Sequence, residues 1–208
     1  MDGLVSNSSL IAGVVGAGAG TSTVVLSGFA GLAAGAFSMA AGEYISVKSQ
    51  TESIEAEVES ERHELTVNAE GEQRELAQMY EARGLSPALA AQVAAELSKD
   101  FEHTLDIHVR EELGVDKDAL PSAVVAGISS FVAFSTGAFL PLLPYLLGAT
   151  SFLPAAIITG VALFAAGAAV SIVTPRSWWY SGVRQLGFGA AAALVTFAVG
   201  SAVGTGLG

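Results

Sequence analysis

The sequence lacks cysteine entirely, and it lacks charge over most of its length. The absence of cysteine excludes disulfides and thiolate metal sites. Residues 3–47 carry only Glu43 as a charged side chain, and residues 119–208 carry only Arg176 and Arg184. A water-soluble domain does not leave such stretches bare, because charged side chains normally cover much of its surface. We therefore expect lipid, rather than water, to surround both ends of the chain.

A phosphate-binding loop of the Walker type is also missing, so nothing in the sequence supports ATP-driven pumping. The net charge of −11 equals the balance of residues 48–118, which hold 18 acidic and seven basic side chains. An acidic module of this kind repels nucleic acid and anionic lipid and attracts cations. We therefore expect cations as partners and no nucleic acid.

Five apolar segments have the length of a membrane span, since a bilayer core of about 30 Å needs about 20 helical residues. The predicted spans are residues 4–25, 27–47, 123–147, 152–173 and 183–207. The first lacks the positive start of a cleaved signal peptide and is too long for one. Glycine pairs four residues apart, at 16/20, 31/35 and 200/204, allow close helix contact within a protomer or between two.

The distribution of lysine and arginine predicts the orientation in the membrane. Seven of the nine lie between spans two and three, and Arg176 and Arg184 lie between spans four and five. Both connections are on the same side of a five-span protein, so all nine are expected in the cytoplasm. The amino terminus is then inside and the carboxyl terminus outside. Trp178, Trp179 and Tyr180 are typical of an anchor at the cytoplasmic interface.

The acidic window between the second and third spans is rich in helix-forming residues. At about 100° per residue, one stripe of this helical stretch contains Glu57, Glu61, Glu64, Glu72 and Glu75. Asn68 and Gly71 are expected to interrupt the helix, so that the stripe folds back on itself as a hairpin. Further helices are predicted at residues 87–98, after a cap at Ser86, and at residues 101–113.

Repeated like charges on one helix face are destabilising by a few tenths of a kcal/mol each, so the stripe needs compensation. Carboxylates with an occasional imidazole suit iron, manganese and zinc. Among the histidines, His108 is the best candidate because Glu111 and Glu112 follow it at i+3 and i+4. A solvated acidic face remains the alternative to a metal site.

One acidic side chain lies within a predicted span. Glu43 follows Met39 by four residues, which places a carboxylate and a thioether on one face of the second span. An ionisable group inside a span costs roughly 2.5 kcal/mol or more and usually marks an ion path. The alternative is that Glu43 lies at the interface, near Lys48. Asp2 enters the first span from the same side and would complete a site that combines carboxylate and thioether ligands.

Several runs resemble the vacuolar iron transporter family. The run from Asp2 to Ser6 resembles the start of its first span, and the run from Gly31 to Gln50 is similar to its second span. Further matches are residues 83–86, 110–114 and 141–144, so the resemblance covers essentially the whole chain. Members usually have a lead-in before the aspartate that Asp2 matches, and a truncated start is therefore expected.

This resemblance implies an all-α integral membrane protein, a dimer of five-span protomers with a cytoplasmic helical metal-binding domain between spans two and three. The domains are then residues 1–49, 50–118 and 119–208. It implies export of Fe2+, often also Mn2+, from the cytosol in exchange for protons. By motif, Asp2, Met39 and Glu43 would form the path, and the metal ligands in the cytoplasmic domain would be Glu61, Glu64, Glu72, Glu75 and Glu112. Many members have a methionine pair near His108 and Val109, where a histidine retains the capacity to bind metal.

Two other functions are compatible with acidic helices attached to a membrane. A di-iron ferroxidase would use Glu-x-x-His motifs, and the window contains none. A metal sensor without transport would leave Asp2, Met39 and Glu43 without a role. We therefore expect a transporter and not an enzyme, with Fe2+, Mn2+ or Zn2+ bound as cargo. The membrane is expected to be the plasma membrane in a prokaryote and a vacuolar-type membrane in a eukaryote.

Overall fold

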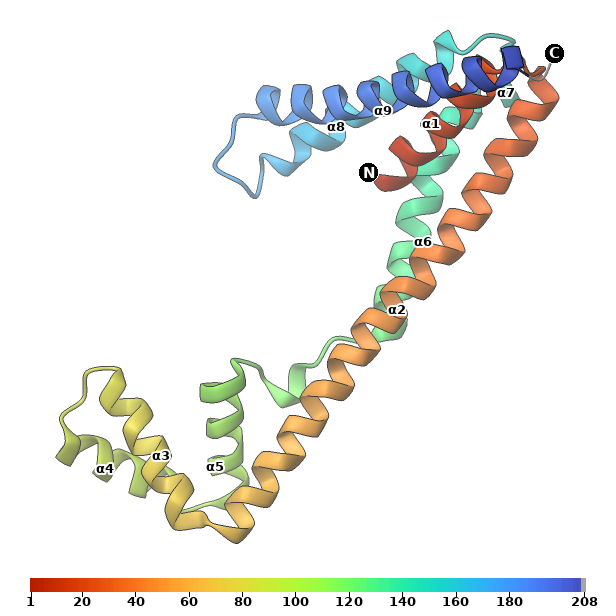
Figure 1. Cartoon of the computed structure of the whole chain (residues 1–208). Helices are drawn as coiled ribbons and strands as arrows, with labels where there is room; N and C mark the ends of the chain where they lie inside the picture. The colour runs from red at the N-terminus through yellow and green to blue at the C-terminus, as the bar shows by residue number, and fades with distance from the viewer. Residues whose placement is uncertain (207–208) are drawn as a thin grey trace. The chain divides into compact units, whose positions relative to one another are not determined.

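The computed structural model describes residues 1–206, and every regular element in that range is a helix (Figure 1). The chain divides into two compact units. One consists of Met1–Glu43 together with the described residues from Val124 onward, and we call it the apolar unit. The other is Tyr44–Ala123, which we call the acidic unit. The 47-residue helix α2 (Thr21–Val67) contributes to both of them.

The apolar unit begins with α1 (Asp2–Gly16) and the first half of α2. A second group of helices follows the acidic unit, namely α6 (Ala123–Phe139), the 3-10 turn η3 (Leu140–Leu142), α7 (Leu143–Leu146), α8 (Leu153–Val170) and α9 (Trp178–Gly206). Pro141 lies where α6 gives way to the 3-10 turn, because proline has no N–H to continue the helical ladder. A buried cluster of Ile11, Val24, Leu142, Tyr145 and Ala155 joins α1, α2, η3, α7 and α8.

The first predicted span is wrong in its extent. Helix α1 stops at Gly16, and the chain turns through residues 17–20, where Gly18 has a positive φ of 78°. A helix of 15 residues is about 22 Å long, less than a bilayer core. Four segments are long and apolar enough to cross a membrane: Thr21–Val67, Lys117–Leu146, Leu153–Val170 and Trp178–Gly206. Position 207, where the last span was predicted to end, lies outside the described residues.

Small residues bring α1 and α9 into close contact. A Cβ atom added to Gly200 would lie 1.9 Å from the carbonyl oxygen of Gly13, and one added to Gly204 would lie 2.7 Å from that of Ala17. Only glycine allows backbones to approach so closely. The predicted packing role is thus confirmed for the Gly200/Gly204 pair, and this contact fixes α1 within the apolar unit.

The apolar unit exposes large hydrophobic side chains that a soluble protein would bury. Leu26, Leu147 and Ile172 are 71 %, 85 % and 85 % exposed. In each of the four long apolar segments, no more than 28 % of the most apolar window is buried. Apolar surface of this extent requires lipid around it. The chain is therefore a multi-pass membrane protein.

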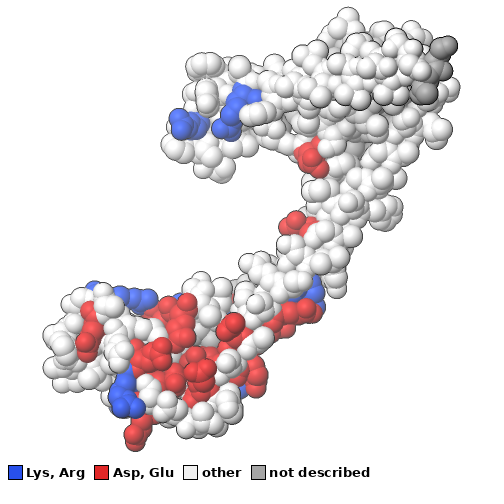
Figure 2. Space-filling view, in the orientation of Figure 1, with Lys and Arg blue, Asp and Glu red and all other residues white. Residues whose placement is uncertain are grey.

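The acidic unit is a small helical module with its own core. It contains the second half of α2, then α3 (Ala69–Ala82), α4 (Pro87–Leu97), α5 (Phe101–His108), the π-helical turn η1 (Val109–Leu113) and the 3-10 turn η2 (Lys117–Ala119). The predicted break at Asn68 is confirmed, whereas Gly71 lies inside α3. Ser86 occupies the predicted N-cap position of α4, but its side chain makes no capping hydrogen bond. Acidic side chains crowd this unit, while the apolar unit is almost free of charge (Figure 2).

Candidate metal centre

A pocket of about 110 Å³ in the acidic unit is walled mainly by carboxylates. Helix α2 turns back into α3 at Asn68, which brings the two halves of the glutamate stripe together. The pocket is lined by Glu57, Ser60, Glu61, Glu64, Glu72, Glu75, Val109, Glu112 and Leu113. The five glutamates that were predicted as cytoplasmic ligands thus all face one space, contributed by α2, α3 and η1.

His108 lies beside three of these glutamates and is completely buried. Its Nδ1 atom lies 3.0 Å from Oε1 of Glu61, 3.1 Å from Oε1 of Glu112 and 4.0 Å from Oε2 of Glu72. A fully buried imidazole surrounded by three carboxylates is unlike a histidine on a solvated face, because each buried polar group needs a partner. The sixth predicted ligand therefore lies beside three of the other five.

Glu61, His108 and Glu112 each offer one ligand atom, and these atoms lie within 4.8 Å of one another. Nitrogen and oxygen ligands of one ion, each about 2.1 Å from it, lie at most about 4.2 Å apart. A small contraction would therefore allow all three to bind a common cation. Imidazole with carboxylates suits iron, manganese and zinc.

Burial and electrostatic repulsion raise the pKa values of two glutamates in this pocket. Burial, followed by the charges of Glu112 and Glu72, raises the pKa of Glu61 from 4.5 to about 7. Burial and the neighbouring Glu75 also raise the pKa of Glu72. Carboxylates with raised pKa values favour a proton or another cation nearby. The pocket is therefore short of positive charge when all its glutamates are ionised.

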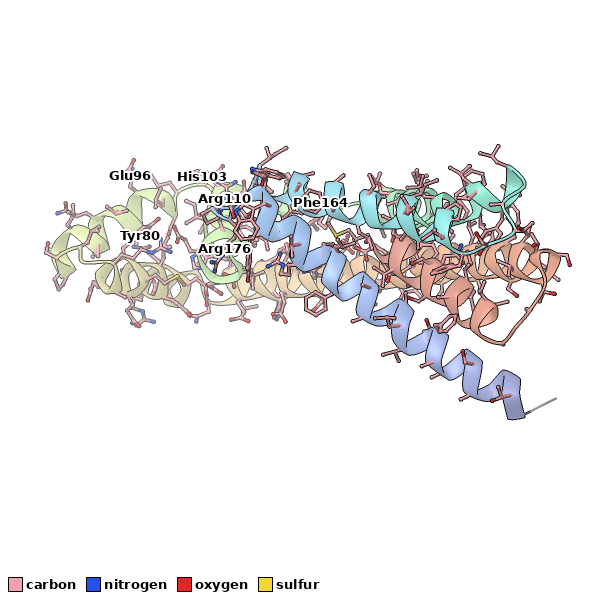
Figure 3. All side chains as sticks on the ribbon, turned by 90° about the horizontal axis from the view of Figure 1, so that it is seen from above. Tyr80, Glu96, His103, Arg110, Phe164 and Arg176 are labelled. Atoms are coloured by element: carbon pink, nitrogen blue, oxygen red, sulfur yellow. The ribbon has the colours of Figure 1, made fainter. Side chains whose placement is uncertain are left out.

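The two adjacent glutamates of η1 have different partners. Glu112 faces His108, whereas Glu111 forms an ion pair with Arg83 and accepts a hydrogen bond from the Tyr80 hydroxyl at 3.4 Å. Tyr80, which extends from α3, is labelled in Figure 3. The hydrogen bond from Arg83 lowers the pKa of Glu111. These contacts hold the π-helical turn against α3, and such turns are frequent at functional sites.

Two polar residues that line the pocket were not among the ligands predicted from sequence. Glu57 belongs to the glutamate stripe, one turn before Glu61, so helical periodicity already placed it on this face. Ser60 donates a hydrogen bond to Oε1 of Glu64 at 3.4 Å. A serine within a helix carries no comparable signal, because its role depends on what the fold brings next to it.

A second pocket, in the apolar unit, has a volume of about 260 Å³. It is lined by Asp2, Ser6, Asn7, Leu10, Gly31, Gly35, Ser38, Met39 and Phe134. Asp2 and Met39, from α1 and α2, thus face the same space, as the sequence predicted. Asp2 accepts a hydrogen bond from Ser6 at 3.1 Å. Glu43, one helical turn after Met39, is exposed and does not line this pocket.

Comparison with known proteins agrees with these features. A model of the VIT family matches residues 1–201. The chain is 32 % identical over 205 residues to vacuolar iron transporter 1 of Arabidopsis thaliana, covering 97 % of this chain and 82 % of that protein. It is 44 % identical over 121 residues to a vacuolar iron transporter of Acanthamoeba castellanii, covering 58 % of this chain and 45 % of that protein. The chain therefore belongs to the VIT family, a family of transporters and not of enzymes.

Proposed function

We propose that the protein exports Fe2+, and also Mn2+, from the cytosol in exchange for protons. The relatives reported above are named iron transporters, which supports iron as the cargo. The observation that carries the proposal is the presence of two ligand-bearing pockets in one membrane chain. One is rich in carboxylates and lies in the water-exposed acidic unit, and the other combines Asp2 with Met39 in the apolar unit. The ions are cargo, and no prosthetic group is needed.

The acidic pocket is proposed to capture the ion. Its glutamates and the buried His108 supply the oxygen and nitrogen ligands that iron and manganese accept. A cluster of negative charge also raises the local concentration of cations. The raised pKa of Glu61 supports this role, since a bound cation would offset the burial and the repulsion that keep its proton attached.

The second pocket is proposed to be the entrance of the translocation path. The Asp2 carboxylate is a hard ligand and the Met39 thioether a soft one, a combination that suits Fe2+ better than Ca2+ or Mg2+. Glu43 is proposed to carry the coupled proton. It lies on α2 one turn from Met39, and a carboxylate at that position can hold either a proton or a metal ion.

The proposed topology has five spans, with α1 as the short first one. The close packing of α1 on α9 supports this, because α9 is one of the four long apolar segments. The acidic unit and the amino terminus are placed in the cytoplasm by the positive-inside rule. We propose a homodimer in a vacuolar-type membrane if the source is eukaryotic, and in the plasma membrane otherwise.

Reconstitution into liposomes tests this function directly. Fe2+ under anaerobic conditions, Mn2+, Zn2+ and Ca2+ would be offered with and without an imposed proton gradient, and uptake would be measured together with the internal pH. We expect Fe2+ and Mn2+ to enter in exchange for protons and Ca2+ to be excluded. Empty liposomes are the control. Metal binding without any uptake would favour a sensor, and oxygen-dependent Fe2+ oxidation would favour a ferroxidase.

A further inference from the structure

Asn7 is a buried polar residue in the wall of the Asp2/Met39 pocket, and neither helical periodicity nor the family resemblance gives it a role. It lies on α1 and is only 2 % exposed. Its Oδ1 atom is buried and has no hydrogen-bond partner. An amide oxygen left unpaired in an apolar interior costs free energy, because it has given up its hydrogen bonds to water. We therefore expect this oxygen to have a transient binding partner.

The orientation of this amide is fixed by its other end. Nδ2 of Asn7 donates a hydrogen bond to the carbonyl oxygen of Ala138 at 2.6 Å. Ala138 lies in the last turn of α6, where helical carbonyls lack partners within their own helix. A flipped amide would place two oxygens against each other, so the donor must face Ala138. The oxygen is thereby held away from α6.

The oxygen points toward α2, into the space beside Gly31. A Cβ atom added to Gly31 would lie 2.9 Å from Oδ1 of Asn7. Gly31 and Asn7 both line the pocket that holds Asp2 and Met39. Asp2 is exposed, whereas Asn7 is buried, so the pocket runs from an exposed end at Asp2 to a buried end at Asn7. Because Gly31 has no side chain, the oxygen can lie close to α2, and the Leu10 side chain borders the same space.

We propose that the amide oxygen of Asn7 is an ion ligand at the buried end of this pocket. It binds the divalent cation after the ion has been bound by Asp2 and Met39. The inference rests on the proposed transport function and assigns a further residue to its path. A neutral carbonyl oxygen suits hard cations such as Mn2+. Because water does not reach this oxygen, only an ion that has lost part of its hydration shell can bind it. Asn7 would therefore help to select which ions pass.

The test compares ion selectivity in reconstituted full-length protein. The readout is the Zn2+ concentration that halves Mn2+ uptake, because misfolded protein contributes no uptake and cannot change this value. Asn7→Leu removes the oxygen while keeping the number of side-chain heavy atoms and the branching at Cγ. Gly31→Ala keeps the Asn7 side chain but places a methyl group against its oxygen and against the Leu10 side chain. Ser9→Ala is the matched control, since Ser9 is also buried on α1 with an unpaired hydroxyl but does not line this pocket.

We expect the inhibitory Zn2+ concentration to fall about tenfold in Asn7→Leu and in Gly31→Ala, since the softer ion loses less when an oxygen ligand is removed. Ser9→Ala should behave as wild type. Complete loss of uptake in a variant that melts and elutes like wild type is the stronger form of the expected result. If Asn7→Leu does not fold, Gly31→Ala decides. Wild-type selectivity in the deciding variant overturns the inference alone, whereas absence of Mn2+ and Fe2+ uptake by the wild type overturns the proposed function.

Discussion

Nδ1 of the buried His108 lies 3.0 Å from Oε1 of Glu61, although 47 positions separate them in the chain. The hairpin at Asn68 and the π-helical turn η1 bring the two together with Glu112. This relationship argues against a merely solvated acidic face, because a buried imidazole among carboxylates requires a specific geometry.

Glu111 and Glu112 are adjacent and carry the same charge, which makes them a matched pair for substitution. Glu112→Gln should lower Mn2+ affinity about tenfold or more, because it removes a ligand beside His108. Glu111→Gln should change the affinity less than about threefold and instead cost roughly 0.5–1 kcal/mol of stability, by loosening the contacts with Arg83 and Tyr80. Calorimetric titration and thermal melting of the full chain in detergent separate the two effects. Equal losses of affinity would contradict the assignment.

The raised pKa of Glu61 predicts how stability changes with pH. The folded acidic unit holds this proton up to about pH 7, whereas an unfolded carboxyl loses it near pH 4.5. The stabilisation from the bound proton is therefore full below pH 4.5 and is lost as the pH rises to 7, a change of up to about 3 kcal/mol. Glu61→Gln should flatten this dependence and be the more stable form at pH 8. Hydrogen exchange in α3 and η1 at pH 5 and pH 8 measures it, and unchanged pH dependence in the variant would contradict the prediction.

Removal of either ligand at the path entrance should stop transport. Asp2→Ala and Met39→Ala should each reduce Fe2+ flux at least tenfold while the protein stays folded, because a partly dehydrated cation would be left without a ligand. Thr136→Val serves as a control, since Thr136 is exposed on α6 and does not line the pocket. Uptake assays in liposomes, with protein amounts matched by size-exclusion chromatography, give the comparison. Wild-type flux in both variants would exclude this path.

Glu43 should affect coupling rather than capture. Glu43→Gln removes a group that can exchange a proton for a metal ion, so the flux should respond less to an imposed proton gradient. Uptake at several values of internal pH, at one external pH, measures this response. Glu55→Gln is a suitable control because Glu55 is an exposed glutamate further along the same helix. Survival of the full gradient dependence in Glu43→Gln would place the coupling group elsewhere.

Helical periodicity was sufficient to predict the glutamate stripe and the hairpin, because both depend on local spacing and on a local break at Asn68. It was not sufficient for the end of α1. Apolar residues continue on both sides of the turn at residues 17–20, so composition alone gives no boundary there. The different partners of Glu111 and Glu112, and the burial of Asn7, depend on segments distant in sequence: α3 for Glu111 and α6 for Asn7. Single-sequence patterns do not contain that information.

In the proposed function, the acidic pocket captures the metal ion and the Asp2/Met39 pocket is the entrance of the translocation path. The most direct measurement is Fe2+ uptake as a function of concentration in a variant with Glu61, Glu64, Glu72 and Glu75 all changed to alanine. Its matched control changes four exposed glutamates outside the pocket, Glu55, Glu59, Glu70 and Glu81, and so removes the same charge. We expect only the pocket variant to lose uptake at low Fe2+ concentration, by about tenfold or more. At high Fe2+ concentration its flux should return to the wild-type value. Equal behaviour of the two variants, or a loss that persists at saturating Fe2+, would contradict this expectation.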